Sequence, residues 1–379
     1  MQSRYRTMLK PPAIVEFLAG SWQKIPAFFP GTLADDLPVL TADELAWLAT
    51  LPDVESRLIF TERSGSGVSY RLEWGPFDQQ TLENLPERDW TLLIQDVDKH
   101  LPDFRAWFDS VDFIPDWRID DLMVSFAAPG GGVGPHRDNY DVFLCQGVGV
   151  REWHVSGDDI AQDPAASDDL ALTETFEGES REVREGDVLY LPPGIAHWGT
   201  ARRACITYSI GMRAPQLSDL ADELPDSECE NSFYADKDLG VDESTAGYIS
   251  PASVRRAMDL LHSADDEFDR VAVALGRFVT ETKDWITPET LSDDEAADAI
   301  IALQRGARLD LHGMARIAYD DRNLYVNGGF MALPEGARSL VENICVGRRY
   351  ARQAQTITDC HHCLKWMLKM GVFEIPEIL

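Results

Sequence analysis

The pattern of hydrophobic and polar positions divides the chain into three stretches. From about residue 57 to residue 215, short apolar or alternating runs are separated by turns rich in glycine and proline. Many short strands of this kind favour a closed β architecture over alternating βαβ units. The second stretch has helical periodicity, and the third combines helices with a hairpin. The fold class is therefore expected to be α+β.

Strands are expected where apolar or alternating runs are bounded by turn residues. Such runs lie at 57–60, 69–72, 121–127, 142–146, 151–155, 188–191 and 204–211, and around Val183. Gly147-Val148-Gly149 separates two of these runs, which predicts that 142–146 and 151–155 form a hairpin.

Two helices are expected within the first part of the chain. Thr41 and Glu44 form a capping-box pattern ahead of a run of spaced leucines, which predicts the start of a helix. The segment 91–108 is also interpreted as a helix, leading into the strand at 121–127.

The second stretch carries a heptad pattern after an acidic segment at 216–250 that is interpreted as a linker with some helix. Val254, Leu261, Phe268 and Leu275 recur every seventh residue, and Ala257, Ala264, Val271 and Phe278 follow three positions after them. Such repeats favour a helix–helix seam between two chains. The alternative is one amphipathic helix, or two joined near 263–266, packed within one chain.

The third stretch predicts a small domain of helices and a hairpin. Ser292 and Glu295 form a second capping box, and strands at 315–319 and 324–326 flank a turn before two further helices. This order is typical of a winged-helix-like domain. The chain is therefore expected to divide into domains at 1–215, 216–285 and 286–379.

Length and apolar content agree with several folded domains and give no sign of a membrane protein. The 379 residues exceed what one hydrophobic core usually supports. No window approaches the roughly 18 apolar residues of a membrane span, and the N-terminus lacks the apolar core of a secretory signal. Six scattered cysteines fit reduced thiols, so a cytoplasmic location is expected.

The net charge of −31 argues against a nucleic-acid groove as the main working surface. The winged-helix-like segment itself has more acidic than basic residues, so direct DNA binding is not expected. Solubility is the simpler interpretation of the charge, and steering of a basic partner is the alternative.

Two groups of residues have the composition of metal sites. Cys360-His361-His362-Cys363 lies in a run with helical character and lacks a second ligand pair at zinc-finger spacing, so a structural role is favoured. His136 and Asp138 stand two residues apart, and such residues on a strand face the same side.

A third ligand for that pair is predicted from a separate motif. Two histidines and one carboxylate on one face of a metal are diagnostic of non-haem Fe(II) oxygenases. A His-x-Asp pair alone is a weak signal. Gly186, Pro192 and Gly194, however, precede His197 in the order of the second signature of the cupin fold. These turn residues direct the histidine toward a barrel mouth.

Two neighbouring features bear on this site. The glycines of 130–134 are not followed by a helix pattern or a βαβ unit, so a dinucleotide-binding loop is rejected in favour of close backbone approach to the ligands. Arg151 follows Gly149 and is expected to return to the barrel interior along the predicted hairpin. A buried arginine needs an anion, whereas a surface arginine paired with Glu152 is the alternative.

Three motifs together resemble the JmjC-type ribosomal oxygenases, and among them the bacterial ribosomal protein arginine hydroxylases. They are Asp121-Leu-Met-Val-Ser-Phe, the run from Pro129 to Gly149, and Tyr208-Ser-Ile-Gly-Met-Arg-Ala-Pro. The resemblance implies a JmjC double-stranded β-helix (the cupin jelly roll) as the catalytic domain. A helical dimerisation domain and a C-terminal winged helix would follow it, so that the protein would be a homodimer.

The resemblance also implies the site residues. Fe(II) would be bound by His136, Asp138 and His197, and 2-oxoglutarate by Arg151, a position held by lysine in the human relatives. Ala127 departs from the small polar residue expected beside the cosubstrate, and Ser125 or Tyr190 would compensate. The substrate pocket would be lined by Asp121, Met123, Tyr140 and Ser209, with Asp121 pairing with a guanidinium and Tyr140 packing on it.

The implied activity is that of a dioxygenase that consumes O₂ and 2-oxoglutarate. It would hydroxylate a β-carbon of an arginine in the large-subunit ribosomal protein L-sixteen, a basic partner. Hydroxylation of another residue such as histidine is the alternative within the family. A non-oxidative metal cupin and a catalytically idle adaptor are the alternatives outside it. The usual first motif of non-oxidative metal cupins has two histidines and a glutamate, which 136–138 do not supply.

Overall fold

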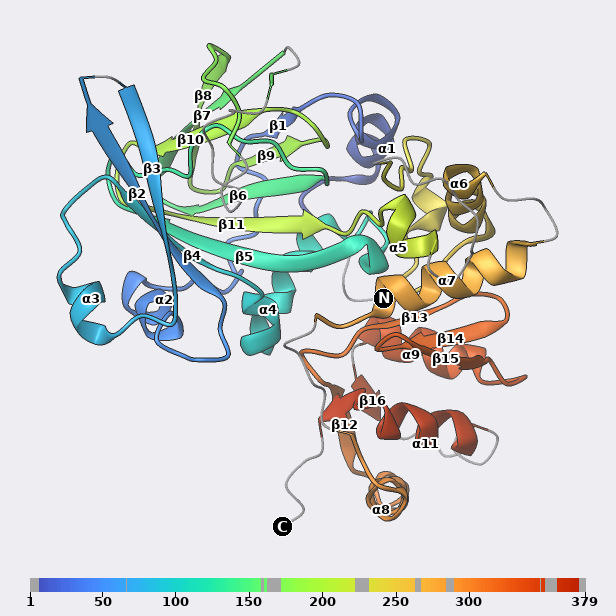
Figure 1. The fold of residues 1–379 in the computed structure, drawn as a ribbon. Helices are drawn as coiled ribbons and strands as arrows, with labels where there is room; N and C mark the ends of the chain where they lie inside the picture. The colour runs from blue at the N-terminus through green and yellow to red at the C-terminus, as the bar shows by residue number, and fades with distance from the viewer. Residues whose placement is uncertain are drawn as a thin grey trace. The chain divides into compact units, whose positions relative to one another are not determined.

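The structure is a computed structural model that describes residues 7–65, 67–157, 160–161, 172–221, 232–262, 267–283, 290–347, 349–351 and 360–374. The chain forms two compact units (Figure 1). The first comprises Met1–Asp112 and Ile119–Met212, and the second Phe113–Arg118 and Arg213–Leu379. Among the described residues, no helix is long and apolar enough to cross a bilayer.

The first unit is built on an antiparallel sheet of eight strands in the order β1-β9-β6-β11-β5-β4-β2-β3. These strands are β1 Ala27–Phe29, β2 Ser56–Ser64, β3 Gly67–Trp74, β4 Trp90–Ile94, β5 Ile119–Ala127, β6 Val142–Val148, β9 Val188–Leu191 and β11 Cys205–Met212. A second sheet has the order β10-β7-β8, with β7 Val150–Val155, β8 Glu179–Arg184 and β10 His197–Ala201. Figure 1 shows it lying over β6 and β9.

Strand register gives the large sheet two chemically different faces. Thr207 and Ser209 of β11 lie opposite Ser125 and Met123 of β5, so these four residues share one face. Tyr208 points to the other face, where the ring of Trp107 stacks on it at a centroid distance of 4.0 Å. The apolar face is therefore covered by the N-terminal elements, and the polar face is turned to the barrel interior.

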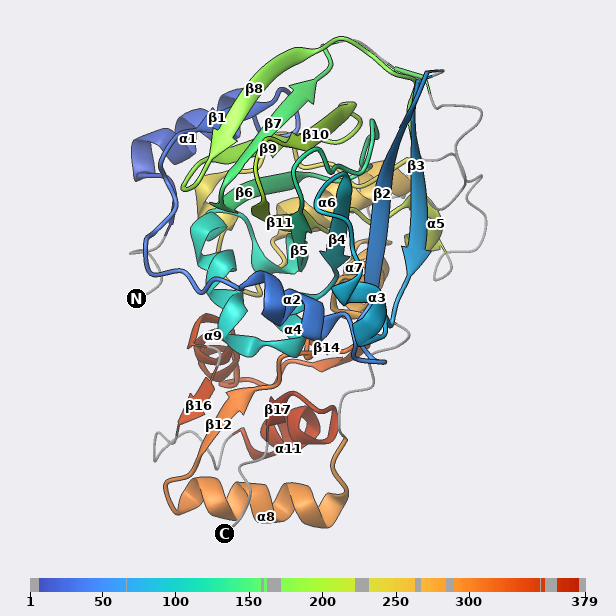
Figure 2. The same ribbon diagram turned by 90° about the vertical axis from the view of Figure 1, so that its left-hand side faces the viewer.

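Short helices cover the apolar face of the large sheet in the first unit (Figure 2). They are α1 Pro11–Gly20, α2 Ala42–Leu48, α3 Gln79–Glu83, α4 Val97–His100 and the 3₁₀ segment η2 Pro102–Val111. The predicted capping box is confirmed, because the Thr41 hydroxyl accepts from the Glu44 amide and the Glu44 carboxylate accepts from the Thr41 amide.

The helix predicted at 91–108 is wrong for its first residues, whereas two short helical segments, α4 and η2, occupy most of 97–108. Residues 90–94 form β4, which pairs with β2 on one side and β5 on the other. Its Leu92, Leu93 and Ile94 are buried on both faces. Such a continuous apolar run is typical of a central strand, and Pro102 then begins a separate 3₁₀ segment.

The hairpin predicted between 142–146 and 151–155 is also wrong. The two strands exist, but β6 pairs with β9 and β11 whereas β7 pairs with β8 and β10. Gly149 at φ +74° turns the chain from one sheet to the other. The strand β10, which carries His197 and pairs with β7, was not predicted.

In the second unit, two helices share one apolar core. They are α6 Pro251–Leu261 and α7 Phe268–Thr280, preceded by α5 Leu217–Ala221 and the 3₁₀ segments η3 Asp116–Arg118 and η4 Val241–Glu243. Val254, Leu261 and Leu275 are buried in this core. The heptad positions are thus packed within the chain, as in the alternative interpretation, while Ala264 lies outside the described residues.

The interpretation of 216–250 as a linker is wrong for its described part. Leu220 and Tyr234 are buried in the same core as α6 and α7, and Leu239 is buried as well. These buried residues could not be predicted from the acidic segment, because apolar residues spaced irregularly in a loop have no periodicity to detect.

The C-terminal part of the second unit has its own core and the predicted element order. Its helices are α8 Asp293–Gln304, α9 Arg338–Gly347 and α11 His361–Lys369, and its strands are β12 Arg308–Leu311, β13 Ile317–Tyr319, β14 Asn323–Val326, β15 Gly329–Ala332, β16 Arg349–Ala351 and β17 Phe373–Glu374. The Ser292 capping box and the β13–β14 hairpin are confirmed. The division at 215 and 285 stays a prediction, and the second of these boundaries falls outside the described residues.

Candidate metal centre

Glycines bring the backbone of 130–134 between β4 and β10. A Cβ on Gly131 would lie 2.1 Å from the Trp90 carbonyl oxygen, and one on Gly132 would lie 2.4 Å from the Gly199 carbonyl oxygen. Gly130 and Gly134 have φ of +84° and +86°, which side chains rarely adopt. The run therefore serves close backbone passage, and it delivers the chain to His136.

His136, Asp138 and His197 come together in the first unit. One ligand atom from each lies within 4.8 Å of the other two, and no other such group of three occurs among the described residues. His197 Nε2 is 3.7 Å from Asp138 Oδ2. The His136 amide donates to the His197 carbonyl at 3.0 Å, and the reverse bond measures 2.8 Å. This reciprocal bridge fixes two ligands that are far apart in sequence.

Backbone carbonyls determine which ring nitrogens are available in this group. His136 Nδ1 lies 2.9 Å from the Gly134 oxygen, and His197 Nδ1 lies 3.0 Å from the Ile195 oxygen. A carbonyl only accepts, so each Nδ1 carries a hydrogen, and Nε2 is the ring nitrogen of each histidine that can bind a metal. Burial and the neighbouring His136 lower the pKa of His197 to about 4, against the opposing effect of Asp138. Neutral imidazoles of this tautomer are suited to bind a divalent metal.

Arg151 reaches the same interior from β7. Its side chain is only 4% exposed, and its Nε and Nη2 have no hydrogen-bond partner among the described residues. Arg151 lies opposite Ala201 in β10, so it shares a face with Gly199 and His197. Two buried donors without a partner are costly, which indicates an anion-binding position.

Gly199 makes room for this arginine. A Cβ there would lie 2.9 Å from the ring of Trp153 and 3.0 Å from Cδ of Arg151. The Arg151 guanidinium carbon is 5.5 Å from the Trp153 ring centroid. Trp153 packs in turn with the apolar side chains Val142, Leu144, Leu189 and Leu191. The buried arginine thus stands beside a cluster of apolar side chains.

The predicted substrate residues lie on the polar face of β5 and β11 or on the loop beside it. Asp121 and Met123 pair with Gly211 and Ser209. Tyr140 is partly exposed. Its pKa is raised well above the ordinary value by the charge of Asp138, by burial and by the charge of Asp121. Tyr140 therefore remains a neutral phenol near both carboxylates.

Of the two residues expected to compensate for the missing polar side chain at Ala127, only one lies on the same face of the sheet. Tyr190 lies on the apolar face, where its hydroxyl donates to Asp141 at 2.5 Å and accepts from the Gln23 amide at 2.8 Å. It therefore cannot compensate for Ala127, whereas Ser125 is buried on the interior face. Thr91 lies directly opposite Ala127, and its hydroxyl is buried without a partner among the described residues.

The position of Thr91 beside Ala127 was not predicted from the sequence. Only the pairing of β4 with β5 places it beside Ala127. The Cys360–Cys363 run, in contrast, behaves as predicted. Both cysteines are buried in the apolar core of the C-terminal part, and His361 and His362 are exposed.

Comparison with known proteins gives consistent similarities. Residues 107–220 match the family described as JmjC domain. The chain is 33% identical over 322 residues to the ribosomal protein uL16 3-hydroxylase of Escherichia coli (strain K12), an alignment that covers 83% of this chain and 84% of the relative.

Solved structures agree with this. The X-ray structure of E. coli YcfD superposes with a TM-score of 0.74 at 28% identity, covering 97% of this chain and 99% of that one. A structure of YcfD, a ribosomal oxygenase, in complex with cobalt and 2-oxoglutarate gives a TM-score of 0.72 at 29% identity with the same coverage. Together with the two facing sheets, these similarities confirm the jelly-roll prediction.

Proposed function

The chain belongs to the JmjC-type ribosomal oxygenases, and we propose that it hydroxylates an arginine side chain of the large-subunit ribosomal protein uL16. It is a dioxygenase that uses Fe(II), 2-oxoglutarate and O₂. The observation that carries the proposal is the pairing of two features in one barrel interior. These are a histidine–aspartate–histidine group and a buried arginine with unused donors.

The residues present fit an Fe(II) ion. His136, Asp138 and His197 would hold it through two neutral Nε2 atoms and one carboxylate oxygen, the ligand set of non-haem Fe(II) oxygenases. When bound, the iron supplies the activation of O₂, which is coupled to decarboxylation of 2-oxoglutarate to succinate and CO₂. The protein's own part is to fix the ligands, which it does through the reciprocal backbone bridge and the two Nδ1 hydrogen bonds.

Arg151 is suited to bind the distal carboxylate of 2-oxoglutarate. A guanidinium fork donates two parallel hydrogen bonds to a carboxylate, and Nε and Nη2 provide such a pair. The apolar side chains packed around Trp153 make this surrounding less polar than water, and an ion pair is stronger there. We propose Ser125 and Thr91 as the neighbouring hydroxyls of this position.

Asp121, Met123, Tyr140 and Ser209 are proposed to bind the substrate arginine. The Asp121 carboxylate pairs with the guanidinium, and the neutral ring of Tyr140 offers a face on which the guanidinium packs. Because Tyr140 also lies near Asp138, this arrangement directs the aliphatic part of the arginine toward the metal ligands.

The partner and the location belong to the same proposal. A ribosomal protein is basic, and the net charge of −31 attracts it. The protein is proposed to act in the cytoplasm. A homodimer is also proposed, from the layout of the family. Because the heptad residues of α6 and α7 are buried within the chain, such a dimer would use other faces of these helices.

The proposal is tested by incubating the purified protein with Fe(II), 2-oxoglutarate, O₂ and a uL16 peptide. Succinate is expected to form in step with a mass gain of one oxygen on a single arginine. The Asp138→Ala variant is expected to form neither. Absence of peptide-stimulated succinate would overturn the proposal, and an oxygen on histidine would favour the other hydroxylase alternative.

A further inference from the structure

The segment that follows β4 makes a group of contacts with the start of β5, where Asp121 stands. Gln95 Nε2 donates to Asp121 Oδ2, and the Asp96 amide points to the same oxygen at 3.4 Å. Asp121 Oδ2 is therefore held from two sides. Sequence analysis did not single out Gln95.

Arg57 fixes the orientation of the Gln95 amide. Its Nη2 donates to Gln95 Oε1 at 2.9 Å and lies 3.8 Å from the sulfur of Met123. Since an arginine only donates, the atom that faces it is the amide oxygen, and the NH₂ group must face Asp121. The order Arg57, Gln95, Asp121 is thus a directed chain of hydrogen bonds.

Buried charges hold the backbone beneath this chain. The Leu122 amide donates to Asp98 Oδ1 at 2.9 Å, and Lys99 Nζ donates to the Asp120 carbonyl at 3.2 Å. Lys99 also forms ion pairs with Asp96 and Asp98, and all three side chains are buried. Breaking a buried ion pair leaves an unpaired charge in the interior, which is costly in free energy. The segment that follows β4 is therefore held firmly in place.

The other carboxylate oxygen of Asp121 borders a position where a side chain is missing. A Cβ on Gly211 would lie 3.2 Å from Asp121 Oδ1 and 3.9 Å from Cε2 of Tyr140. A side chain at position 211 would therefore crowd Asp121 Oδ1 and touch Tyr140, the two groups that are proposed to contact the substrate guanidinium.

We propose that Gln95 is a positioning residue for Asp121 and thereby sets the preference for arginine. The inference rests on the proposed function. By holding Oδ2, Gln95 fixes the plane of the carboxylate, with Oδ1 on the side of Gly211 and Tyr140. A planar guanidinium depends on that plane, because it binds through a fork. A lysine ammonium is a point charge and depends on it far less.

Binding of two uL16 peptides tests this inference, one with the target arginine and one with lysine in its place. The protein is loaded with Co(II) and 2-oxoglutarate so that both dissociation constants can be compared without turnover. Gln95→Leu and Gln95→Ala are expected to raise the dissociation constant of the arginine peptide about tenfold. This is the effect of losing one hydrogen bond to a charged group. The dissociation constant of the lysine peptide is expected to change little.

Turnover with Fe(II) adds a second readout. The KM for the arginine peptide is expected to rise in both variants, while kcat at saturating peptide and the KM for 2-oxoglutarate stay near the wild-type values. Gln79→Leu is the matched control, because the exposed side chain of Gln79 donates a hydrogen bond to Glu83 within α3. The thermal midpoints of all variants are measured to confirm folding.

The outcomes separate the two hypotheses. If wild-type protein does not turn over the arginine peptide, the proposed function fails. If wild-type protein turns it over but neither Gln95 variant alters its binding, only the inference is overturned. Equal weakening of the arginine and lysine peptides would show a merely structural role and would also overturn it.

Discussion

Arg151 carries two guanidinium nitrogens that find no hydrogen-bond partner among the described residues. At the scale of single residues this is the strongest sign of an anion-binding position, because buried donors are normally satisfied. The sequence alone left open a surface arginine paired with Glu152. In the structure, Glu152 instead accepts from Ser180 and pairs with Arg202. The interior position of Arg151 removes that alternative.

Arg151→Met is expected to raise the KM for 2-oxoglutarate by about ten- to a hundredfold, since it deletes a charged fork and keeps the apolar stem. The KM of the Arg151→Lys variant for 2-oxoglutarate should lie between those of Arg151→Met and the wild type. Succinate formation at varied 2-oxoglutarate measures this. Arg181→Met, on the exposed edge strand β8 of the same sheet, is the control. An unchanged KM for Arg151→Met would contradict the assignment.

Thr91→Val is expected to raise the KM for 2-oxoglutarate severalfold, because it removes the hydroxyl opposite Ala127. The same change should increase the free energy of unfolding by about 1 kcal/mol, since a buried hydroxyl without a partner is costly. Urea unfolding and cosubstrate titration measure the two effects. Thr61→Val on β2 removes another such hydroxyl and is expected to affect stability alone. Equal KM values for both variants would argue against a role of Thr91.

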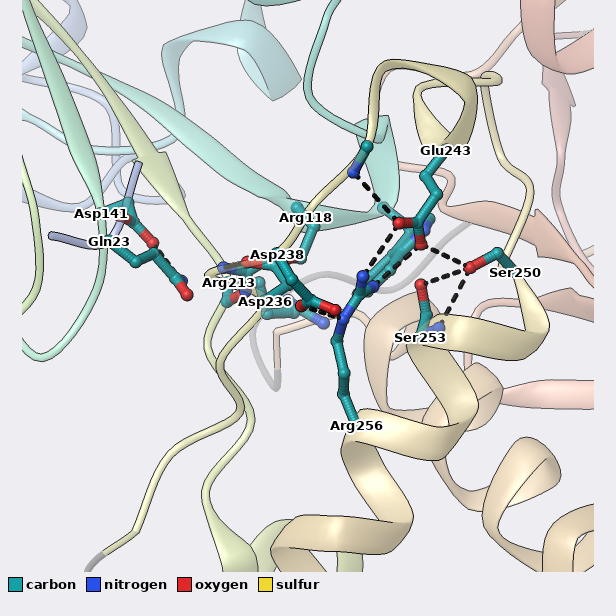
Figure 3. Close-up of polar contacts among 12 residues, drawn as sticks. Gln23, Arg118, Asp141, Arg213, Asp236, Asp238, Glu243, Ser250, Ser253 and Arg256 are labelled. Atoms are coloured by element: carbon teal, nitrogen blue, oxygen red, sulfur yellow. Dashed lines mark hydrogen bonds and ion pairs between the residues drawn. The ribbon is translucent and has the colours of Figure 1, made fainter. Parts of the chain in front are cut away.

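At the scale of elements, the start of α6 shows how local charge stabilises a helix (Figure 3). Arg256 donates to both oxygens of Glu243, at 2.8 and 2.9 Å, and to Asp238 at 2.8 Å. The Ser250 hydroxyl donates to Glu243 and accepts from the Ser253 amide as the N-cap of α6. One arginine on the helix thus anchors the loop that precedes it.

The pKa of Glu243 follows from these contacts. Burial raises it, but the hydrogen bonds from Arg256, Ser250 and the Gly240 amide outweigh burial and lower it. A carboxyl whose pKa is lowered in the folded state contributes stability above its ordinary value of 4.5. That contribution is lost as the pH falls through the lowered value.

Glu243→Gln is expected to destabilise the α6 region by about 1–2 kcal/mol at neutral pH, because it removes the carboxylate that Arg256 binds through two hydrogen bonds and leaves Asp238 as its charged partner. The difference from the wild type should begin to shrink as the pH falls below about 4.5, where the carboxyl of the unfolded chain takes up a proton, and should vanish below the lowered pKa of the folded state. Amide hydrogen exchange of α6 as a function of pH measures both. Glu267→Gln, which loses only the exposed pair with Arg270, is the control. A difference that persists at acid pH would contradict this account.

At the scale of the whole molecule, net charge bears on the encounter with the basic substrate that is proposed. A chain with a charge of −31 attracts a basic protein over distances comparable to the Debye length, about 10 Å at 0.1 M salt. Contacts within the barrel interior are shielded from salt to a greater degree. The association of the protein with its substrate should therefore depend more strongly on ionic strength than the reaction within the site does.

Intact uL16 is expected to show a KM that rises with salt between low and physiological ionic strength. A short peptide around the target arginine should show a weaker rise, because it carries less of the positive charge. Turnover of both substrates at several salt concentrations measures this, and kcat serves as the internal control. Identical salt dependence for the two would contradict charge steering.

The metal ligands could be predicted from the sequence because their signals are local. His136 and Asp138 stand on one short segment, and the turn residues before His197 dictate how that histidine is presented. Capping boxes at Thr41 and Ser292 are local in the same sense, and both are confirmed. Each depends on groups only a few residues apart, so no knowledge of distant pairing is needed.

The tertiary structure decided which strands meet and which faces they share. The sequence places 142–146 beside 151–155, yet the two strands belong to different sheets. Thr91 comes to lie opposite Ala127 only because β4 pairs with β5, and Arg151 comes to share a face with His197 because β7 pairs with β10. Strand pairing over such separations is set by closure of the two sheets around a shared interior, a property of the whole chain that no local pattern encodes.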